Sequence, residues 1–311
     1  MDEGNGALSK DVPDVPGASH APDDDLARPS AMKALLGRHG IHPSRRFGQN
    51  FLTSRSALDR IVAAAALEPD ETALEIGPGA GVLTRELSCR CRRVVALELD
   101  RNMIPVLADS LAGRTNVTIH QGDALRLDWN QVLEGAEPAK VVANIPYNIT
   151  SPLLARILEH GPRFRSATLL VQREVADRMV ARAGDDAYGS LSLFVAYHAT
   201  ARIVAKVPPG AFLPPPKVES AVVHLEPLRK PPVDEPADSF FRTTRAAFGQ
   251  RRKTLRNALS AGLALGPESV AEILLSIGVD PGRRAETVDI ATFAAIARGL
   301  RESLEGAARN D

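Results

Sequence analysis

The sequence is poor in cysteine and in aromatic residues, and it contains no long apolar run. Of its 311 residues, two are cysteines and 4% are aromatic. Cys89 and Cys91 form one C-x-C pair, which lacks the second ligand pair of a zinc site and fits a reducing compartment. No stretch approaches the roughly 20 apolar residues that span a bilayer. We therefore expect no bound metal, no disulfide and no membrane partner.

The beginning of the chain lacks the apolar core of a signal peptide. Residues 1–28 contain seven acidic and two basic side chains, interspersed with prolines and glycines. This composition is typical of disordered segments. We interpret residues 1–30 as a disordered acidic tail. Because no targeting signal is apparent, the expected location is the cytoplasm.

The zero net charge of the chain conceals a basic body. Residues 29–311 hold 36 basic and 31 acidic side chains. The basic residues cluster in GRHGIHPSRR, in RAAFGQRRKTLR and in the GRR of residues 282–284. A modest, clustered positive charge permits a polyanionic partner such as RNA but does not require one.

Strand and helix patterns alternate up to about residue 230. Short apolar, β-branched runs such as TALEI (72–76) and AKVVAN (139–144) predict strands covered on both faces. The segment SALDRIVAAAALE predicts an amphipathic helix with Ser56 as its N-cap. Repeated β-α units predict an α/β fold with a doubly wound, mostly parallel sheet over residues 31–230. The runs ARIVAKVPPGAF and ESAVVHLEPL predict a strand pair that closes one edge of this sheet.

A proline-rich, charged segment, RKPPVDEPAD (229–238), predicts a linker between two domains. Beyond it, the runs SFFRTTRAAFGQRRKTLRNALSAG, PESVAEILLSIG and DIATFAAIARGLRESL are helical in pattern. They predict a small all-helical C-terminal domain over residues 231–303, followed by a short tail over 304–311.

A glycine turn follows the first strand of the repeated units. In LEIGPGAGVLT, the glycines at 77, 79 and 81 are spaced G-x-G-x-G, whereas the dinucleotide fingerprint would need a glycine at Val82. Glu98 ends the next strand and Asp123 the one after it. Carboxylates there can accept ribose hydroxyls and an adenine amino group, although each residue alone could equally be a helix N-cap. Adenosine without a pyrophosphate clamp suggests S-adenosylmethionine (SAM) rather than a nicotinamide cofactor.

The turn after the fourth strand reads Asn144-Ile145-Pro146-Tyr147. Pro146 fixes its own φ and biases Ile145 toward an extended conformation. The Ile145 carbonyl and the Asn144 side-chain oxygen could then converge on an amino group with two N–H donors, while Tyr147 offers a face on which a ring can stack. An unusual turn that caps the helix at Ser151-Pro152 is the alternative, but it does not explain the aromatic residue.

Seven motifs carry a resemblance to a known family. In chain order they are PSRRFGQNFL, EIGPGAGVLT, NIPYNITSPLL, QREVADRM, YGSLS, FLPPPKVESAVV and AFGQRRKTLRNAL. Their order and spacing resemble the KsgA/RsmA family of small-subunit rRNA adenine N6,N6-dimethyltransferases, from about residue 33 to 302. Glu219 stands where the family pattern has aspartate, a conservative change. The resemblance implies a Rossmann-like SAM-dependent methyltransferase domain with a small all-helical C-terminal domain.

At the matching positions, the resemblance implies a cofactor site and a base site. In the cofactor site Glu98 binds the ribose, Asp123 the adenine, and Gly77 lies against the methionine part. In the base site Phe212 stacks on the target adenine opposite Tyr147. The predicted cofactor-binding residues are Asn50, Leu52, Gly77, Gly79, Glu98, Asp123 and Asn144, with Gln49 beside them, and the predicted catalytic residues are Asn144, Tyr147 and Phe212.

The implied reaction is SAM-dependent N6,N6-dimethylation of two adjacent adenines in a loop near the 3′ end of 16S rRNA. The expected partner is this RNA within an immature 30S particle, and we expect a monomer that contributes to subunit biogenesis. Two alternatives stay open: a large-subunit rRNA adenine methyltransferase of the antibiotic-resistance type, and a non-enzymatic ribosome-assembly factor on the same scaffold. The retained Asn144 and Tyr147 argue against the second.

Basic side chains are the candidates for RNA contact. In RAAFGQRRKTLRNAL, Arg245, Arg252 and Arg256 are expected to share one stripe of a helix, beside an apolar core stripe of Phe248, Leu255 and Leu259. A solvated surface would explain the arginines equally well, and the resemblance shifts the interpretation toward rRNA. Arg45 and Arg46, in the loop before Phe47, are further candidates.

Overall fold

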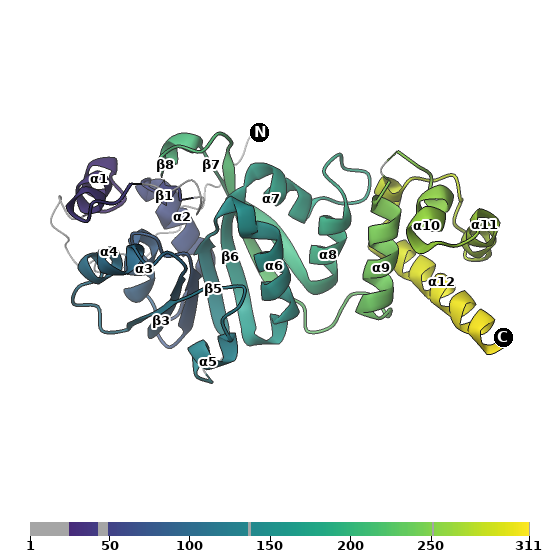
Figure 1. Ribbon diagram of the computed structural model, residues 1–311, viewed down its shortest axis with the longest axis horizontal. Coiled ribbons are helices and arrows are strands. Elements are labelled where there is room, and N and C mark those ends of the chain that lie inside the picture. The colour runs from purple at the N-terminus through teal and green to yellow at the C-terminus, as the bar shows by residue number, and fades with distance from the viewer. Residues whose placement is uncertain (1–24, 43–48, 136–137, 251, 311) are drawn as a thin grey trace, which may run out of the picture.

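The computed structural model describes residues 25–42, 49–135, 138–250 and 252–310. It contains a sheet flanked by helices and, at the other end of the long axis, a separate group of helices (Figure 1). The α/β fold with a helical C-terminal unit is thereby confirmed.

The main sheet has seven strands in the order β4-β3-β2-β5-β6-β9-β7. All neighbouring pairs from β4 to β6 are parallel, whereas β9 runs antiparallel to both β6 and β7. The expected strand pair at one edge is therefore confirmed. The strands are β2 (Thr72–Ile76), β3 (Arg93–Glu98), β4 (Val117–Gln121), β5 (Ala139–Asn144), β6 (Phe164–Gln172), β7 (Ala199–Val207) and β9 (Ser220–Pro227).

Helices cover both faces of the sheet because alternate strand residues bury on opposite sides. Ala73 of β2 packs in one apolar cluster with α2, α3 and α4, whereas Leu74 packs in a second with α5, α6 and α7. Both residues are 0% exposed. These helices are α2 (Arg55–Ala65), α3 (Val82–Ser88), α4 (Met103–Ser110), α5 (Trp129–Leu133), α6 (Thr150–Glu159) and α7 (Arg173–Val180).

A third apolar cluster holds the helical unit together and joins it to the sheet domain. It combines residues of α9 to α12 with Leu193 and Tyr197 of α8, and the Tyr197 hydroxyl donates to the Glu235 carbonyl. Glu235, in the predicted linker, is buried and pairs with Arg301. The helices are α8 (Ser190–His198), α9 (Ala237–Phe248), α10 (Leu255–Leu263), α11 (Pro267–Ser276) and α12 (Ile290–Asn310).

Both predicted tails overlap folded residues. Leu26 and Ala27 are buried in the first cluster, just before α1 (Pro29–Arg38), so the part of the 1–30 tail that the structure describes belongs to the fold. At the other end, α12 continues to Asn310 rather than stopping near residue 303. Composition misled at the N-terminal end, because two apolar side chains, Leu26 and Ala27, suffice to attach a polar segment to the core.

The N-cap prediction for α2 was wrong by two positions. Ser54, not Ser56, precedes the helix, and its hydroxyl accepts a hydrogen bond from the Ala57 amide at 3.4 Å. An N-cap needs non-helical backbone, and Ser54 is extended, whereas Ser56 already lies inside the helix.

Two further properties concern the described residues only. None of their helices combines the length and apolar character needed to cross a membrane. No three of their histidine, cysteine, aspartate or glutamate side chains gather in a way that could hold a metal ion, and Cys89 and Cys91 are free thiols.

Candidate active site

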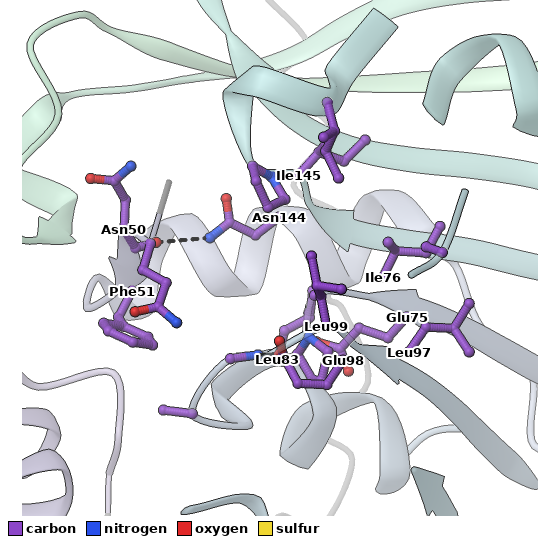
Figure 2. A pocket seen from close by; sticks show the side chains of 18 of the residues that line it. Asn50, Phe51, Glu75, Ile76, Leu83, Leu97, Glu98, Leu99, Asn144 and Ile145 are labelled. Atoms are coloured by element: carbon purple, nitrogen blue, oxygen red, sulfur yellow. Dashed lines mark hydrogen bonds between the residues drawn. The ribbon is translucent and has the colours of Figure 1, made fainter. Parts of the chain in front are cut away.

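A cavity of about 330 Å³ opens at the carboxyl ends of β2, β3, β4 and β5. This is the edge at which open α/β sheets bind their ligands. Figure 2 shows acidic side chains on one side of it and the Asn50–Asn144 pair on the other. The lining includes all the predicted cofactor-binding residues, namely Asn50, Leu52, Gly77, Gly79, Glu98, Asp123 and Asn144, together with Tyr147 and the unpredicted Glu75 and Leu99.

The glycine turn lets the backbone form the floor of this cavity. Gly79 has φ +56°, and a Cβ there would lie 3.3 Å from the Phe51 ring. Gly81 has φ +83° and precedes the first residue of α3. A Cβ at Gly81 would lie 2.8 Å from the Ser110 hydroxyl of α4. Side chains at either position would strain the backbone and collide with neighbouring side chains, so the turn depends on glycine.

Glu98 ends β3 with both carboxylate oxygens already oriented. One oxygen accepts from the Gly79 amide at 3.1 Å and the other from the Asp100 amide at 2.8 Å. Burial raises the pKa of Glu98, and the two backbone donors oppose that effect. Because each carboxylate oxygen has a second lone pair, Glu98 can still accept two hydroxyl groups from a ligand.

Asp123 caps a turn and also lines the cavity. One oxygen accepts from the Leu125 amide at 2.9 Å and caps the turn after β4. The side chain is nevertheless one-third exposed, its second oxygen lies 3.6 Å from Arg126, and the residue lines the cavity. Turn capping therefore holds this carboxylate in place without consuming its acceptors.

Glu75 is a cavity residue that the sequence analysis missed. It lies in β2 with 1% of its surface exposed, and among the described residues its Oε2 atom has no hydrogen-bond partner. Burial, followed by the negative charge of Glu98, raises its pKa to about 8. The sequence did contain a signal for this residue, namely a glutamate in a mostly apolar strand, two residues before the first glycine. Glutamate is almost never fully buried unless it is paired.

Asn144 is held at the end of β5 by the segment that follows the undescribed residues 43–48. Its Nδ2 atom donates to the Asn50 carbonyl at 3.1 Å (Figure 2). The neighbouring Gln49 side chain donates to the Asp100 carboxylate at 2.9 Å. The Asn144 amide group has one acceptor oxygen opposite its donors. Fixing the nitrogen on Asn50 therefore fixes where the Oδ1 acceptor lies.

Tyr147 begins a single 3-10 turn, Tyr147–Ile149, that leads into α6. Its ring is half-buried, and its hydroxyl lies 2.6 Å from the Ser220 hydroxyl. Burial raises the pKa of the phenol, so Tyr147 is neutral at ordinary pH. Because Tyr147 lines the cavity, a ligand base can reach it.

Phe212 does not line the cavity. It begins β8 (Phe212–Leu213), which pairs with β1 (Phe51–Leu52), and its side chain is 3% exposed within the first apolar cluster. The structure thus brings the predicted base-site segment and the FGQNFL segment together but leaves the Phe212 ring buried. A stacking role for Phe212 stays a prediction that requires this ring to rotate outward.

The predicted arginine stripe is interrupted. Helix α9 ends at Phe248, before Gly249, and α10 begins at Leu255, so Arg245, Arg252 and Arg256 do not lie on one helix. Arg245 and Arg252 are exposed and Arg256 is half-buried. The apolar stripe is confirmed as core, since Leu255 and Leu259 are 0% exposed and Phe248 packs against their cluster. The other two candidates, Arg45 and Arg46, lie outside the described residues.

Comparison with known proteins relates this architecture to one family. The model of the family described as ribosomal RNA adenine dimethylase matches residues 42–302. Proteins named ribosomal RNA small subunit methyltransferase A are similar: that of Geobacillus kaustophilus is 41% identical, covering 89% of this chain and 97% of its own length. That of Moorella thermoacetica is 42% identical, covering 89% and 99%.

Solved structures are also similar to this chain, at lower sequence identity. A dimethyladenosine transferase from Plasmodium falciparum superposes with a TM-score of 0.70 at 26% identity, covering 81% of this chain and 98% of its own. The 23S rRNA methyltransferase ErmE gives a TM-score of 0.63 at 28% identity, covering 81% and 100%. With a family match over most of its length, relatives at about 40% identity and this shared fold, the chain belongs to the ribosomal RNA adenine dimethylase family.

Proposed function

We propose that this protein transfers methyl groups from SAM to the N6 atoms of two adjacent adenines near the 3′ end of 16S rRNA, giving N6,N6-dimethyladenosine. One observation carries the proposal. The Asn144 amide is oriented by the Asn50 carbonyl in the lining of a cavity that also contains the buried acids Glu75 and Glu98. The site thus combines a fixed acceptor for an amino group with a pocket of acidic side chains for a cationic methyl donor.

The residues present fit SAM. Glu98 has lone pairs for the two ribose hydroxyls, and Asp123 has a free acceptor position for the adenine amino group. The buried Oε2 atom of Glu75, which has no partner among the described residues, would face a cationic ligand. Bound SAM supplies an electrophilic methyl group on a sulfonium that is a good leaving group. Asn50, Leu52 and the backbone of the glycine turn would contact the remainder of the cofactor.

Positioning is the main contribution of the chain to catalysis. The lone pair on adenine N6 is delocalised into the ring, so the amine is a poor nucleophile. Hydrogen bonds from its two N–H groups to Asn144 Oδ1 and the Ile145 carbonyl favour a tetrahedral nitrogen, which localises that lone pair toward the methyl donor. Tyr147 supplies the face that fixes the ring. No strong base is needed, because the proton becomes acidic only after transfer.

The small-subunit substrate is supported by sequence similarity. Relatives at 41–42% identity are named small subunit methyltransferases, whereas ErmE, named for 23S rRNA, is 28% identical. The target base must leave its stack to reach the cavity, and it does so most easily from an RNA loop. We extend the proposal to an immature 30S particle as the substrate, to a cytoplasmic location, and to a monomeric enzyme. Exposed Arg245 and Arg252 are its candidate phosphate contacts.

Incubation with methyl-labelled SAM and isolated subunits tests this function. The particles come from a strain that lacks the dimethylation, and small and large subunits are offered in equal amounts. Label in small-subunit RNA is expected. Label in large-subunit RNA would favour the antibiotic-resistance type of activity, and label in neither, with the particle still bound, would favour a non-enzymatic assembly factor.

A further inference from the structure

Tyr147 sits on an element that is too short to orient its ring. The 3-10 turn Tyr147–Ile149 is one turn long, and none of its three residues is buried. A ring that stacks on a substrate needs a fixed plane, yet packing contacts alone do not fix a half-buried ring at the end of a loop. Its orientation must come from a contact with a more rigid part of the molecule.

Ser220 provides such a contact. Its hydroxyl lies 2.6 Å from the Tyr147 hydroxyl, within the range of an O–H···O hydrogen bond. Ser220 begins β9 between two strands, in register with Gln172 of β6 and Val207 of β7, and it is 0% exposed. The Arg173 amide also donates to the carbonyl of Glu219, the residue before Ser220. The serine is therefore fixed on both sides by the sheet.

The Tyr147–Ser220 contact can set the plane of the Tyr147 ring because of the chemistry of phenols. Conjugation keeps the phenol O–H in the plane of its ring, so a partner in that plane restricts rotation of the ring about its long axis. Tyr147 lines the cavity, whereas its partner Ser220 does not. Ser220 and Phe212 also belong to one segment, β8 and the start of β9.

We propose that Ser220 is a positioning residue that holds the Tyr147 ring in the plane required for stacking of the target adenine. The inference rests on the proposed function, because it takes the Tyr147 face as the adenine platform. Ser220 does not touch the reacting atoms. Loss of its hydroxyl lowers the rate of methyl transfer and leaves SAM binding unchanged.

A double-mutant cycle measures the coupling. Ser220→Ala and Tyr147→Phe each remove the same hydrogen bond and keep the ring. Each is expected to lower kcat on the order of 3- to 10-fold, and the double variant no further than the single ones, with the Kd for SAM unchanged. Ser166→Ala, which truncates another buried serine near the opposite end of β6, serves as the control and should keep full activity. If the kcat reductions of the two single variants multiplied in the double variant, the proposal would be overturned.

An activity-independent measurement separates this inference from the proposed function. The chain has three tyrosines, so ring-labelled tyrosine gives a simple NMR spectrum. Ser220→Ala should shift the Tyr147 signals and leave those of Tyr188 and Tyr197, which donate to the Val288 and Glu235 carbonyls, in place. Unchanged Tyr147 signals would refute the anchor. Shifted signals in an enzyme that methylates no adenine would leave the anchor standing and overturn the stacking role.

Discussion

Replacing Glu75 with glutamine removes an ionisable group from the most buried part of the cavity. Glu75 is 1% exposed, and its Oε2 atom has no hydrogen-bond partner among the described residues. Desolvation by burial, with the negative charge of Glu98 as a further cause, raises its pKa from 4.5 to about 8. At neutral pH the ligand-free protein therefore keeps this carboxyl mostly protonated.

The raised pKa makes stability depend on pH with a defined sign. In the unfolded chain Glu75 loses its proton near pH 4.5, whereas in the folded protein it keeps the proton up to about pH 8. The folded state thus binds more protons in this window, and the free energy of unfolding falls by about 1.4 kcal/mol per pH unit as pH rises. Over two units, from pH 5.5 to 7.5, the loss due to Glu75 is about 3 kcal/mol.

Urea unfolding of the wild type and of Glu75→Gln at pH 5.5 and 7.5 measures this loss. The variant cannot ionise at residue 75, so it should lack the decrease of about 3 kcal/mol. Other titrating groups, such as His224, whose pKa is lowered by its burial, act in both proteins and cancel in the comparison. Equal pH dependence in the two proteins would refute the account of Glu75.

Four further changes test other parts of the structure. Asn144→Ala should lower methyl transfer about 100-fold or more, by analogy with loss of a transition-state hydrogen bond, and leave RNA affinity nearly unchanged; equal losses in both assays would mean that its role is misassigned. Glu98→Gln should weaken SAM binding ~10- to 100-fold in calorimetry, because it removes a charged acceptor; an unchanged Kd would exclude ribose binding there. Leu259→Ala, in the core of the helical unit, should lower the free energy of unfolding by about 2–5 kcal/mol; a change below 1 kcal/mol would contradict its burial. Arg252→Ala should reduce the salt dependence of RNA binding by about one unit of log–log slope; an unchanged slope would show that no phosphate is contacted.

The buried apolar strands of the sheet were readily predicted from the sequence. TALEI and AKVVAN match β2 and β5 at both ends, because buried parallel strands are short apolar runs bounded by turn residues. The glycine turn and the acids at the strand ends were likewise predictable, since strand ends in such sheets meet at one edge. The structure places Glu98 and Asp123 on the same cavity.

Local sequence patterns could not predict features that depend on contacts between distant segments of the chain. Strands β1 and β8 contain two residues each and pair Phe51 with Leu213, far apart in the chain, and two residues carry no periodicity. The break between α9 and α10 was missed because a helical pattern continues across Gly249. The Tyr147–Ser220 contact was equally invisible, because it joins a loop after β5 to the start of β9.

The central claim is that this site dimethylates adenine N6 in small-subunit rRNA. The most direct measurement incubates the protein with SAM and immature small subunits that lack the modification, digests the RNA and quantifies nucleosides by mass spectrometry. The account predicts two N6,N6-dimethyladenosines per particle with the wild type and almost none with Asn144→Ala. A wild-type digest without N6,N6-dimethyladenosine would contradict it.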